Sequence, residues 1–596
     1  MPVLQFKGKT AVENHHYTVP HHTLEFDKSL SVLGKGQKPS LEGNLIIEGD
    51  NLLALKALLP THAGRIKCIY IDPPYNTGNE GWVYNDNLTQ PQFKEWIGHT
   101  VGKEGEDFCR HDKWCCMMYP RLRLLKELLR PDGMILISID DFEFHNLRSL
   151  MDEIFGIGNH IATLVWEKGR KNDARFFSVG HEYMVVFARS LEFLKSQGAI
   201  WRETKPGAFE LWVEYSRLRD LNGQANGKIE AALREWHKGL HEKHPAKKLS
   251  RWLHVDEFGP WRDRDISWIG GGGPRYNVIH PKTKKPCKVP DRGWGFATPE
   301  SMQRQIDLGL VEFREDHTKP PFLKRHLRPH VEELREDEEG EEEGMDGDED
   351  IALQVMPSVI YKQSQTAVRY LRGLLGENVF ENPKDYLVLS RLFNYCTGPD
   401  DLILDSFAGS GSAGQATLES NKRDNGHRRF ILIQQTFDSK GDAEADRNIC
   451  RTVTQPRLCK SAKQERYDLN FTYARLGPKL FGEYRDFGDQ PPAYEELAKY
   501  VFYTETSHEF DRKALDSKTG RIGEHAGTAY YLLYAPSAKE DRALDLEWLK
   551  KVGAKEKCKK LVDYCEKLWA HRDELTVWEK QASKSLRTML VPVNLK

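Results

Sequence analysis

The sequence has no apolar run of about 18 residues, the length that a membrane-spanning helix needs. It also shows no signal-peptide pattern, and we therefore expect a cytoplasmic protein without a membrane partner. The 10 cysteines form no CxxC pair, which argues against a zinc ribbon and against a secreted disulfide framework. The formal net charge is only -2, so attraction to a charged partner requires a local excess of charge.

Two further kinds of functional sequence are missing. No GxxxxGK[ST] loop and no nuclease constellation occurs, so the chain is not predicted to hydrolyse ATP or to cut DNA by itself. The histidines near the start are more typical of a solvated arm than of a metal site, and we predict no bound metal. They are His15, His16, His21 and His22.

From residue 44 onward the sequence alternates between short apolar runs and amphipathic stretches. The stretch 114–133 predicts a helix that Pro131 and Gly133 close. This alternation predicts a mostly parallel, doubly wound α/β sheet. Four of the apolar runs are predicted to be its buried strands: 65–72, 134–140, 160–168 and 182–189.

Between about residues 190 and 355 this alternation stops. The segment is rich in tryptophan, proline and glycine, and basic residues exceed acidic ones by about ten over 161–330, an excess that suits a polyanion. The insertion is a candidate nucleic-acid reader, with a structural elaboration that bears a solvated charged face as the alternative. The acidic run 332–350 cannot bury enough apolar surface to fold, and we expect a disordered spacer rather than a competitor of DNA.

The stretch LILDSFAGSGSAGQATLE predicts a strand that ends at Asp405, a turn with Gly409 and Gly411, and then a helix. Glycines allow the backbone to approach a ligand closely, and a helix N-terminus favours negative charge. The motif predicts a small-molecule cradle, with a tight packing turn as an equal alternative. The next strand ends in Gln434 instead of an acidic residue, which disfavours ordinary NAD binding.

The motif Asp72-Pro73-Pro74-Tyr75 follows the apolar run KCIYI. Each proline fixes its φ and removes an N–H donor, so the Asp72 carboxylate and the carbonyl oxygens beside it are left as acceptors. Such a set suits a ligand that donates hydrogen bonds, such as an exocyclic amino group, and Tyr75 offers a ring on which a planar base can stack. For DPPY taken alone, the alternative is an ordinary proline turn.

With both motifs and a basic insertion between them, the chain resembles the amino-methyltransferases of DNA. These enzymes carry a [D/N/S]PP[Y/F/W] catalytic motif and an FxGxG cofactor motif on one Rossmann-like sheet, and the motif order here is that of their circularly permuted β class. Over roughly residues 40–440 the chain is similar to the modification (Mod) subunits of type III restriction-modification systems. The blocks that carry this similarity are IYIDPPYNTGN, YNDN, MMYPRL, ISIDD, HNLRSLMDEIFG, HEYMVVFAR and IHPKTKKPCKVPDRGW.

The resemblance implies a site-specific DNA methyltransferase that moves a methyl group from S-adenosylmethionine to N6 of a flipped-out adenine. It implies that Asp72 and Pro73 hold the amino group, that Pro74 completes the catalytic motif, and that Tyr75 stacks on the base. It assigns the cofactor to Asp405, Phe407, Ala408, Gly409 and Gly411, with Pro383 and Lys384 near its methionine end.

Two other cofactor assignments are less direct. Asp50 lies one strand before DPPY and is expected to border the cofactor, with a helix N-cap as an equal alternative. Gln434 stands where many relatives have an acidic ribose-binding residue, and type III relatives commonly have glutamine there.

The insertion is expected to be the target-recognition region, whose lysines and arginines contact the phosphates of double-stranded DNA. The resemblance also implies a helicase-nuclease (Res-like) partner and allows a homodimer. A second DNA contact is predicted between two strands of the catalytic lobe, with a solvated loop as the alternative. Its residues are Lys168, Arg170, Lys171 and Asn172.

Two other functions stay open. Cytosine-N4 methylation uses a chemically similar amino group, although aspartate at the first motif position favours adenine in this family. Alternatively, the chain acts chiefly as the DNA-recognition subunit of a larger restriction complex, with methylation secondary.

These observations divide the chain into five predicted segments. The last of them has no chemical motif, and we expect it to dock a partner or a second copy. The segments are an N-terminal arm (1–43), a catalytic half (44–190), a target-recognition insertion with the acidic loop (191–355), a cofactor half (356–447) and a C-terminal α+β domain (448–596).

Overall fold

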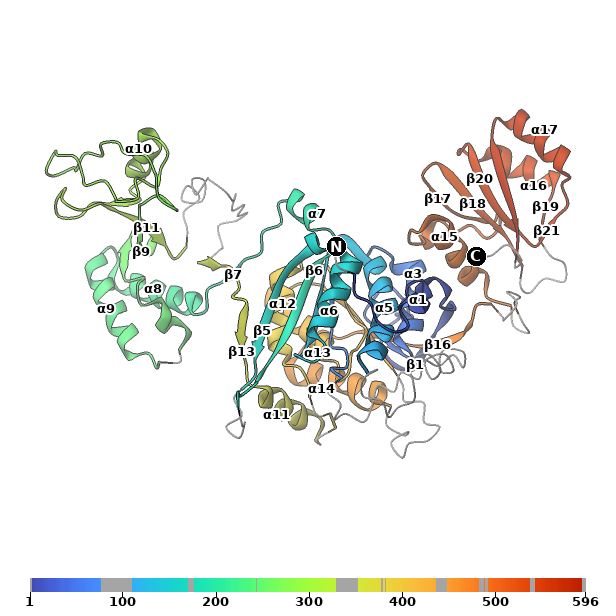
Figure 1. Cartoon of the computed structure of the whole chain (residues 1–596), viewed down its shortest axis with the longest axis horizontal. Coiled ribbons are helices and arrows are strands. Elements are labelled where there is room, and N and C mark those ends of the chain that lie inside the picture. The colour runs from blue at the N-terminus through green and yellow to red at the C-terminus, as the bar shows by residue number, and fades with distance from the viewer. Residues whose placement is uncertain are drawn as a thin grey trace. The chain divides into compact units, whose positions relative to one another are not determined.

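The computed structural model describes residues 3–76, 110–169, 176–242, 244–328, 352–376, 379–380, 382–435, 448–481, 487, 491–535 and 542–591. The predicted acidic loop and the predicted DNA contacts Arg170, Lys171 and Asn172 lie outside these residues. The chain forms two compact units, one of Gly198–Met356 and one of Met1–Gln197 with Pro357–Lys596 (Figure 1).

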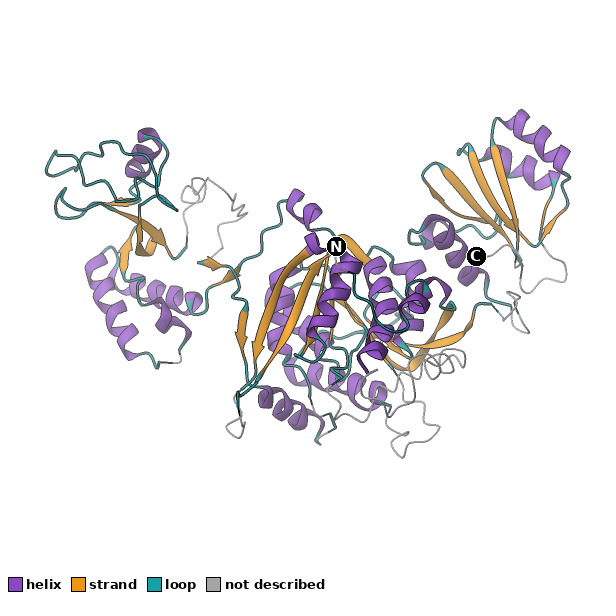
Figure 2. Ribbon diagram, in the orientation of Figure 1, coloured by secondary structure: helices purple, strands orange, loops and turns teal. Residues whose placement is uncertain are grey.

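The larger unit is built on a ten-stranded sheet (Figures 1 and 2). Its strands, in spatial order, are β1 (His22–Val32), β16 (Phe471–Lys479), β2 (Leu45–Glu48), β15 (Arg429–Gln434), β14 (Leu402–Asp405), β3 (Ile66–Ile71), β4 (Leu129–Ile139), β6 (His181–Ala188), β5 (His160–Glu167) and β13 (Val359–Tyr361). The strands from β16 to β4 are parallel, while β1 and β6 run antiparallel to their neighbours. The predicted α/β fold is therefore confirmed.

Helices cover both faces of this sheet (Figure 2). On one face, α3 (Asn51–His62), α5 (Arg110–Leu128) and α6 (Phe144–Met151) share a buried core with Ile69 and Ile71 of β3. On the other face, the Tyr70 ring meets Phe393 of α12 (Tyr386–Cys396), with ring centroids 6.4 Å apart. Alternate residues of a strand point to opposite faces, so the apolar run from Cys68 to Ile71 in β3 reflects burial on both sides.

Further helices extend the second layer and the edges of the larger unit. Helix α13 (Ser412–Asp424) lies next to α12, α11 (Ser364–Leu375) meets α12 through the rings of Tyr370 and Tyr386, and α14 (Gln455–Glu465) contacts α13 and α11. The remaining short helices of the unit's N-terminal part are α1 (Lys9–Val12), α2 (His15–Thr18) and α7 (Leu191–Ser196).

One predicted boundary is wrong. The helix expected to close at Pro131 and Gly133 ends earlier, because α5 gives way directly to β4 at Leu129. The register between β3 and β4 shifts at this point, as in a β-bulge. A Cβ at Gly133 would lie 2.9 Å from the carbonyl oxygens of Arg130 and Ile66, so the glycine serves a close approach of two strands instead of a helix end.

The sheet extends past two of the predicted segment boundaries. β1 comes from the predicted N-terminal arm and pairs with β16, which comes from the predicted C-terminal domain. In Leu24↔Leu476 and Phe26↔Ala474 the pair places apolar side chains together, which gives both segments a place in the sheet.

The C-terminal segment adds a second sheet in the order β17 (Arg521–His525), β18 (Thr528–Leu533), β20 (Lys560–Cys565), β22 (Ser585–Leu590), which we call the C-terminal sheet. Its last three strands are parallel. Helix α15 (Tyr494–Thr506) shares one core with Leu532 and Val562, and α16 (Leu546–Lys551) and α17 (Arg572–Ala582) share another with Leu533 and Leu561. Strands β19 (Ala543–Leu544) and β21 (Lys567–Leu568) form a separate two-stranded parallel sheet in this segment.

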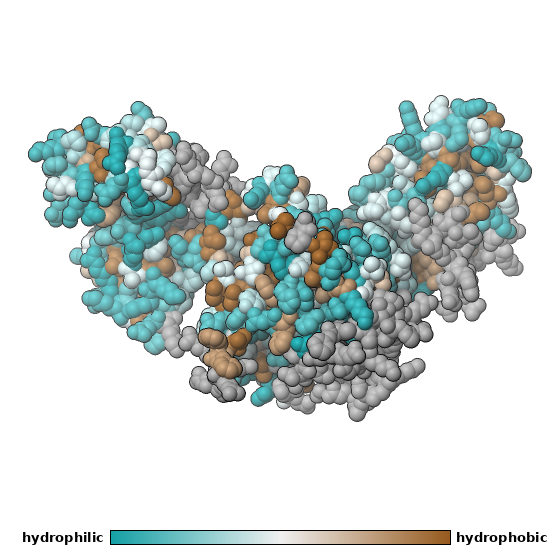
Figure 3. Space-filling view, in the orientation of Figure 1, coloured by the Kyte–Doolittle hydropathy of each residue, from teal (hydrophilic) through white to brown (hydrophobic). Residues whose placement is uncertain are grey.

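The smaller unit begins with the helices α8 (Ala208–Asn222) and α9 (Asn226–Gly239). A four-stranded antiparallel sheet follows, in the order β10 (Val311–Glu312), β11 (Phe322–His326), β9 (Gly259–Asp265), β8 (His254–Asp256), with α10 (Pro299–Asp307) beside it. Strands β7 (Glu203–Thr204) and β12 (Leu353–Gln354) pair where the chain enters and leaves the unit. Figure 3 shows mostly hydrophilic residues on the visible face of this unit. Within the described part of the chain, no helix combines the length and apolarity needed to cross a membrane.

Candidate active site

The two predicted motifs meet at one edge of the large sheet. Strands β3 and β14 are adjacent and parallel, with Cys68 opposite Ile403 and Ile69 opposite Leu404. Asp72 follows the end of β3 and Asp405 ends β14, so both acids lie at the carboxyl ends of neighbouring strands. This is the place where open α/β sheets bind ligands.

Five charged or polar side chains meet just beyond β3, and we call them the catalytic cluster: Asp72, Tyr75, Lys168, Glu182 and Lys384. The Tyr75 hydroxyl lies 2.9 Å from Asp72 Oδ1 and 2.7 Å from Glu182 Oε2. The Lys384 ammonium lies 2.6 Å from the Tyr75 hydroxyl and 3.0 Å from both Asp72 Oδ1 and Glu182 Oε2. The Lys168 ammonium also binds Glu182 Oε2. Residues from three distant parts of the chain are thus joined at one point.

Burial and ion pairing act against each other in this cluster. Burial raises the pKa of Asp72, and Lys384 opposes the shift. Burial also acts to raise the pKa of Glu182, but Lys384 and Lys168 outweigh it and lower that pKa. The pKa of Lys384 is raised, because Asp72 and Glu182 outweigh the effect of burial, whereas burial lowers the pKa of Lys168. The two lysines therefore favour the ionised form of both acids and oppose the effect of burial.

A second group of bonds fixes the DPPY turn. The Trp114 indole N–H donates to the Pro74 carbonyl at 2.7 Å. Asn76, which has a φ of 56°, donates to the fully buried carboxylate of Glu143. His111 Nδ1 lies 2.7 Å from the same carboxylate. Because the turn is anchored on both sides, Asp72 and Tyr75 have a fixed direction of approach.

The predicted cofactor turn lies between β14 and α13. Gly409 and Gly411 have φ values of 50° and 79°, a region that side chains rarely adopt. A Cβ at Gly409 would lie 3.1 Å from the Phe380 ring, and one at Gly411 would lie 3.1 Å from Thr454. The Gly409 N–H donates to Gln434 Oε1 at 2.6 Å, so Gln434 braces the turn from the next strand.

The turn also has the polar groups that a cofactor requires. The Ser406 hydroxyl is buried and has no hydrogen-bond partner among the described residues. Burial raises the pKa of Asp405 well above its usual range, although the Phe407 N–H donates to this carboxyl at 2.9 Å. An orphaned hydroxyl, an acid whose charged form burial disfavours and a turn with two glycines at a helix start fit a hydroxyl-bearing ligand group such as a nucleoside.

The other predicted cofactor residues lie around these two centres. Asp50 caps α3, where its Oδ1 accepts from the Leu53 N–H at 3.1 Å, and the Arg121 guanidinium is 3.8 Å away. Lys384 sends its ammonium into the catalytic cluster, while its carbonyl accepts from the Ser412 hydroxyl at 3.0 Å at the start of α13. Lys384 therefore connects the two motifs physically. Pro383 precedes it and is buried, as is Ala408 in the turn.

Sequence reasoning missed Glu182, the most connected acid of the catalytic cluster. It is the second residue of β6, and its side chain is 4% exposed. A charged residue at the start of the apolar run EYMVVFA was the available signal, since a charge that is buried needs a partner. Lys168, which was predicted to contact DNA, has its ammonium on Glu182, and its role toward DNA stays a prediction.

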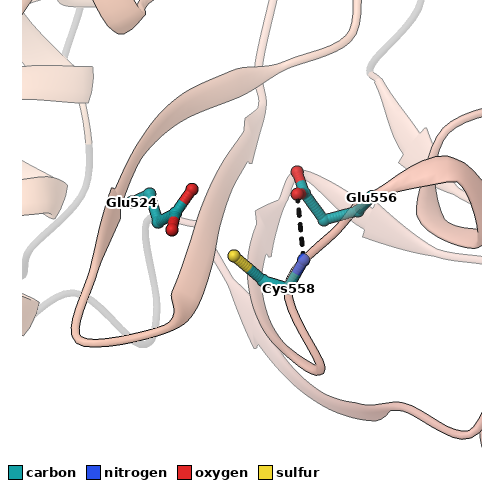
Figure 4. Close-up of side chains that lie close together, drawn as sticks. All are labelled: Glu524, Glu556 and Cys558. Carbon is teal, nitrogen blue, oxygen red and sulfur yellow. Dashed lines mark hydrogen bonds between the residues drawn. The ribbon is translucent and has the colours of Figure 1, made fainter.

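One group of potential metal ligands belongs to the C-terminal segment. The carboxylates of Glu524 and Glu556 and the Cys558 thiol lie within 4.8 Å of one another (Figure 4). Arg521 already bonds both glutamates, at 2.9 Å each, and Glu556 also accepts from the Cys558 N–H. Burial raises the pKa of Cys558 to about 11, so its thiol stays protonated. The group is therefore satisfied by its own cation, and we assign no metal to it.

A parallel α/β sheet that brings DPPY and a glycine turn to one edge defines the class of amino-methyltransferases. A family model described as DNA methylase, of the N6 and N4 type, matches residues 66–444. The chain is 30% identical to the EcoP15I Mod subunit of a type III restriction-modification enzyme from Escherichia coli, over 77% of this chain and 68% of that one. The chain belongs to this DNA methylase family.

Two more relatives carry the names of a Mod subunit and of a methyltransferase. The StyLTI Mod subunit of Salmonella typhimurium is 28% identical over 74% of this chain and 60% of its own length. The type II methyltransferase M.KpnI of Klebsiella pneumoniae is 27% identical over 65% of this chain and 79% of its own. The predicted family, the DNA methyltransferase activity and the use of S-adenosylmethionine, the methyl donor of this family, are confirmed.

Proposed function

We propose that the protein methylates N6 of an adenine flipped out of double-stranded DNA, as the modification component of a restriction-modification or related phage-defence system. The observation that carries this proposal is the junction of Asp72, Tyr75 and Lys384 beside the glycine turn after β14. A base has to leave the duplex to reach such a buried site.

The chain's own residues prepare the amino group. Asp72 and the Pro73 carbonyl accept its two hydrogens, which moves the nitrogen lone pair out of conjugation with the ring and makes it nucleophilic. S-adenosylmethionine, when bound, supplies an electrophilic methyl group on a sulfonium. As the bond from N6 to the methyl carbon forms, the carbon–sulfur bond would break with its electron pair left on the sulfur as a neutral thioether, and the proton that N6 loses would pass to water. Catalysis comes mainly from positioning.

Tyr75 has one ring face for the base. The Lys384 ammonium lies over the ring, 4.9 Å from its centroid, so the flipped base stacks on the opposite face. Its hydroxyl is held by Asp72, Glu182 and Lys384 together, which fixes the ring plane before the base arrives. Such a stack contributes about 1–3 kcal/mol in single-strand binders.

The smaller unit, Gly198–Met356, is the part that we assign to target recognition. One turn in it presents Lys282, Lys284, Lys285 and Lys288, all exposed. The buried His280 builds this turn, because its Nδ1 accepts from the Lys282 and Thr283 N–H groups at 3.2 Å each. Four ammonium groups on one rigid turn suit the phosphates of a duplex.

Partners follow from the relatives. The EcoP15I and StyLTI proteins are named as subunits of type III restriction-modification enzymes. We propose that a helicase-nuclease subunit completes restriction here too, and that the segment 448–596 docks it or a second copy of this chain. The proposed location is the cytoplasm.

The decisive experiment is single-molecule sequencing of DNA from a methylation-free host that expresses this chain alone. We expect N6-methyladenine at one sequence context, and none when the host expresses Asp72→Ala. N4-methylcytosine at a defined sequence would support the cytosine alternative, and unmodified DNA together with sequence-specific binding would support a recognition subunit.

A further inference from the structure

Glu182 is the only acid of the catalytic cluster that comes from the antiparallel part of the sheet. It lies on β6, between β4 and β5. Its Oε2 accepts from the Tyr75 hydroxyl at 2.7 Å and from Lys384 at 3.0 Å, and it also binds Lys168. Its Oε1 is buried and has no partner among the described residues. Glu182 Oε2 therefore binds both ammonium groups of the cluster, those of Lys168 and Lys384.

The charges of the cluster cancel. Asp72 and Glu182 contribute two negative charges, and Lys168 and Lys384 contribute two positive ones. A buried charge without a partner is costly, so each member depends on the other three. The adenine that enters this site is neutral, and a balanced cluster does not have to change its protonation to receive it.

Lys384 is shared equally between the two acids. Its ammonium is 3.0 Å from Asp72 Oδ1 and 3.0 Å from Glu182 Oε2. Without Glu182, both lysines would have Asp72 as their only carboxylate in the cluster. Asp72 is the acceptor on which the amino group of the base depends, so its oxygens would then be occupied by ammonium groups.

We propose that Glu182 is a positioning residue which balances the two lysines and thereby keeps Asp72 available to the amino group of the base. This inference rests on the proposed methyl transfer. The inference also assigns a role to Lys168. Its positive charge balances Glu182, and this charge lowers the rate of methyl transfer when Glu182 is replaced by a neutral residue.

The test compares Glu182→Gln, Lys168→Met and the double variant in the full-length chain. Glu182→Gln leaves one excess positive charge, and we expect kcat to fall about 100-fold while KM for S-adenosylmethionine changes by less than about threefold. The double variant restores neutrality, and we expect its kcat to be at least about tenfold above that of Glu182→Gln. Glu182→Asp keeps the charge on a shorter side chain and should lie between wild type and Glu182→Gln.

A role in packing alone predicts another pattern, because removing a second buried side chain would then lower activity further. If the double variant is as slow as Glu182→Gln or slower, or if Glu182→Gln keeps wild-type kcat, the inference is wrong. Glu192→Gln on the exposed face of α7 is the matched control and should behave as wild type. Thermal melting of each variant identifies loss of folding. If Glu182→Gln does not fold, the kcat values of Glu182→Asp and of the double variant test the inference instead. Failure of the proposed function is distinct, because the wild-type chain itself would then transfer no methyl group to DNA.

Discussion

The catalytic cluster and the C-terminal sheet differ in the partners that they give to a buried acid. In the cluster, Asp72 and Glu182 are surrounded by two lysines and a tyrosine. In the C-terminal sheet, Asp563 of β20 is fully buried, and neither of its carboxylate oxygens has a hydrogen-bond partner among the described residues. Burial raises the pKa of Asp563 to about 7.

The fold pairs the buried acids of the catalytic cluster with cations, whereas no described residue forms a hydrogen bond to the carboxylate of Asp563. Ion pairing in a buried site seldom adds stability, since desolvation cancels most of the attraction. The lysines of the cluster are therefore best explained by chemistry that needs ionised acceptors. Asp405 stands between these extremes: burial raises its pKa, as it raises that of Asp72, but Asp405 accepts from the Phe407 backbone N–H, whereas Asp72 is paired with Lys384.

The largest expected effect comes from removing the charged acceptor. Asp72→Asn replaces an acceptor by an amide that can present N–H groups to the amino group of the base. We expect kcat to fall by more than about 1,000-fold, while binding of target DNA changes by less than about fivefold. Filter assays of labelled methyl transfer and DNA titrations measure the two quantities. A variant with near-normal transfer would remove Asp72 from the catalytic assignment.

The second prediction concerns the unpaired acid. Asp563 has a folded-state pKa of about 7, above the ordinary value of 3.8, so its favourable contribution is complete below about pH 4 and is lost as the pH rises through 7. The lost stability amounts to on the order of 4 kcal/mol at most. In melting curves, the Tm should fall as the pH rises from about 5 to 8, and Asp563→Asn should make this dependence weaker. The exposed Asp573→Asn is the control, and an equal slope in all three proteins would contradict the argument.

The third prediction tests how the lysines support Asp72. Lys384→Met removes the main group that opposes the effect of burial, so the pKa of Asp72 rises further. The acid limb of the kcat profile should move to higher pH, and the maximum kcat should fall about 100-fold. Steady-state rates across the acid range measure both. Lys195→Met on α7 is the control, and an acid limb that moves to lower pH would show that Lys384 does not act on Asp72.

The smallest effect is expected at Asp405, the buried acid of the predicted cofactor turn. Asp405→Asn keeps an oxygen for the Phe407 N–H and removes a charge that burial already disfavours. The affinity for S-adenosylmethionine should change by less than about tenfold, in contrast to the effect of the same substitution at Asp72. Calorimetric titration of the cofactor measures it. A complete loss of binding would mean that Asp405 acts as an ionised group.

The sequence predicted the two strand ends because each carries a local signal. Asp72 to Tyr75 and the turn at Gly409 and Gly411 are short motifs whose residue types suffice to indicate their geometry. Glu182 was not predicted, because two of its partners, Tyr75 and Lys384, lie 107 and 202 residues away in the chain. The early end of α5 was missed for a similar reason, since Gly133 is explained by its distance to Ile66 on the neighbouring strand.

Lys384 bonds the Ser412 hydroxyl through its carbonyl and Asp72 through its ammonium. A ligand that shifts the glycine turn and the start of α13 therefore also shifts the group that neutralises Asp72. Under the proposed function, such a shift would link the free energies of cofactor binding and of base capture. Linkage is reciprocal, so DNA that places a base on Tyr75 would then change the affinity for the cofactor by the same factor as the cofactor changes the affinity for DNA.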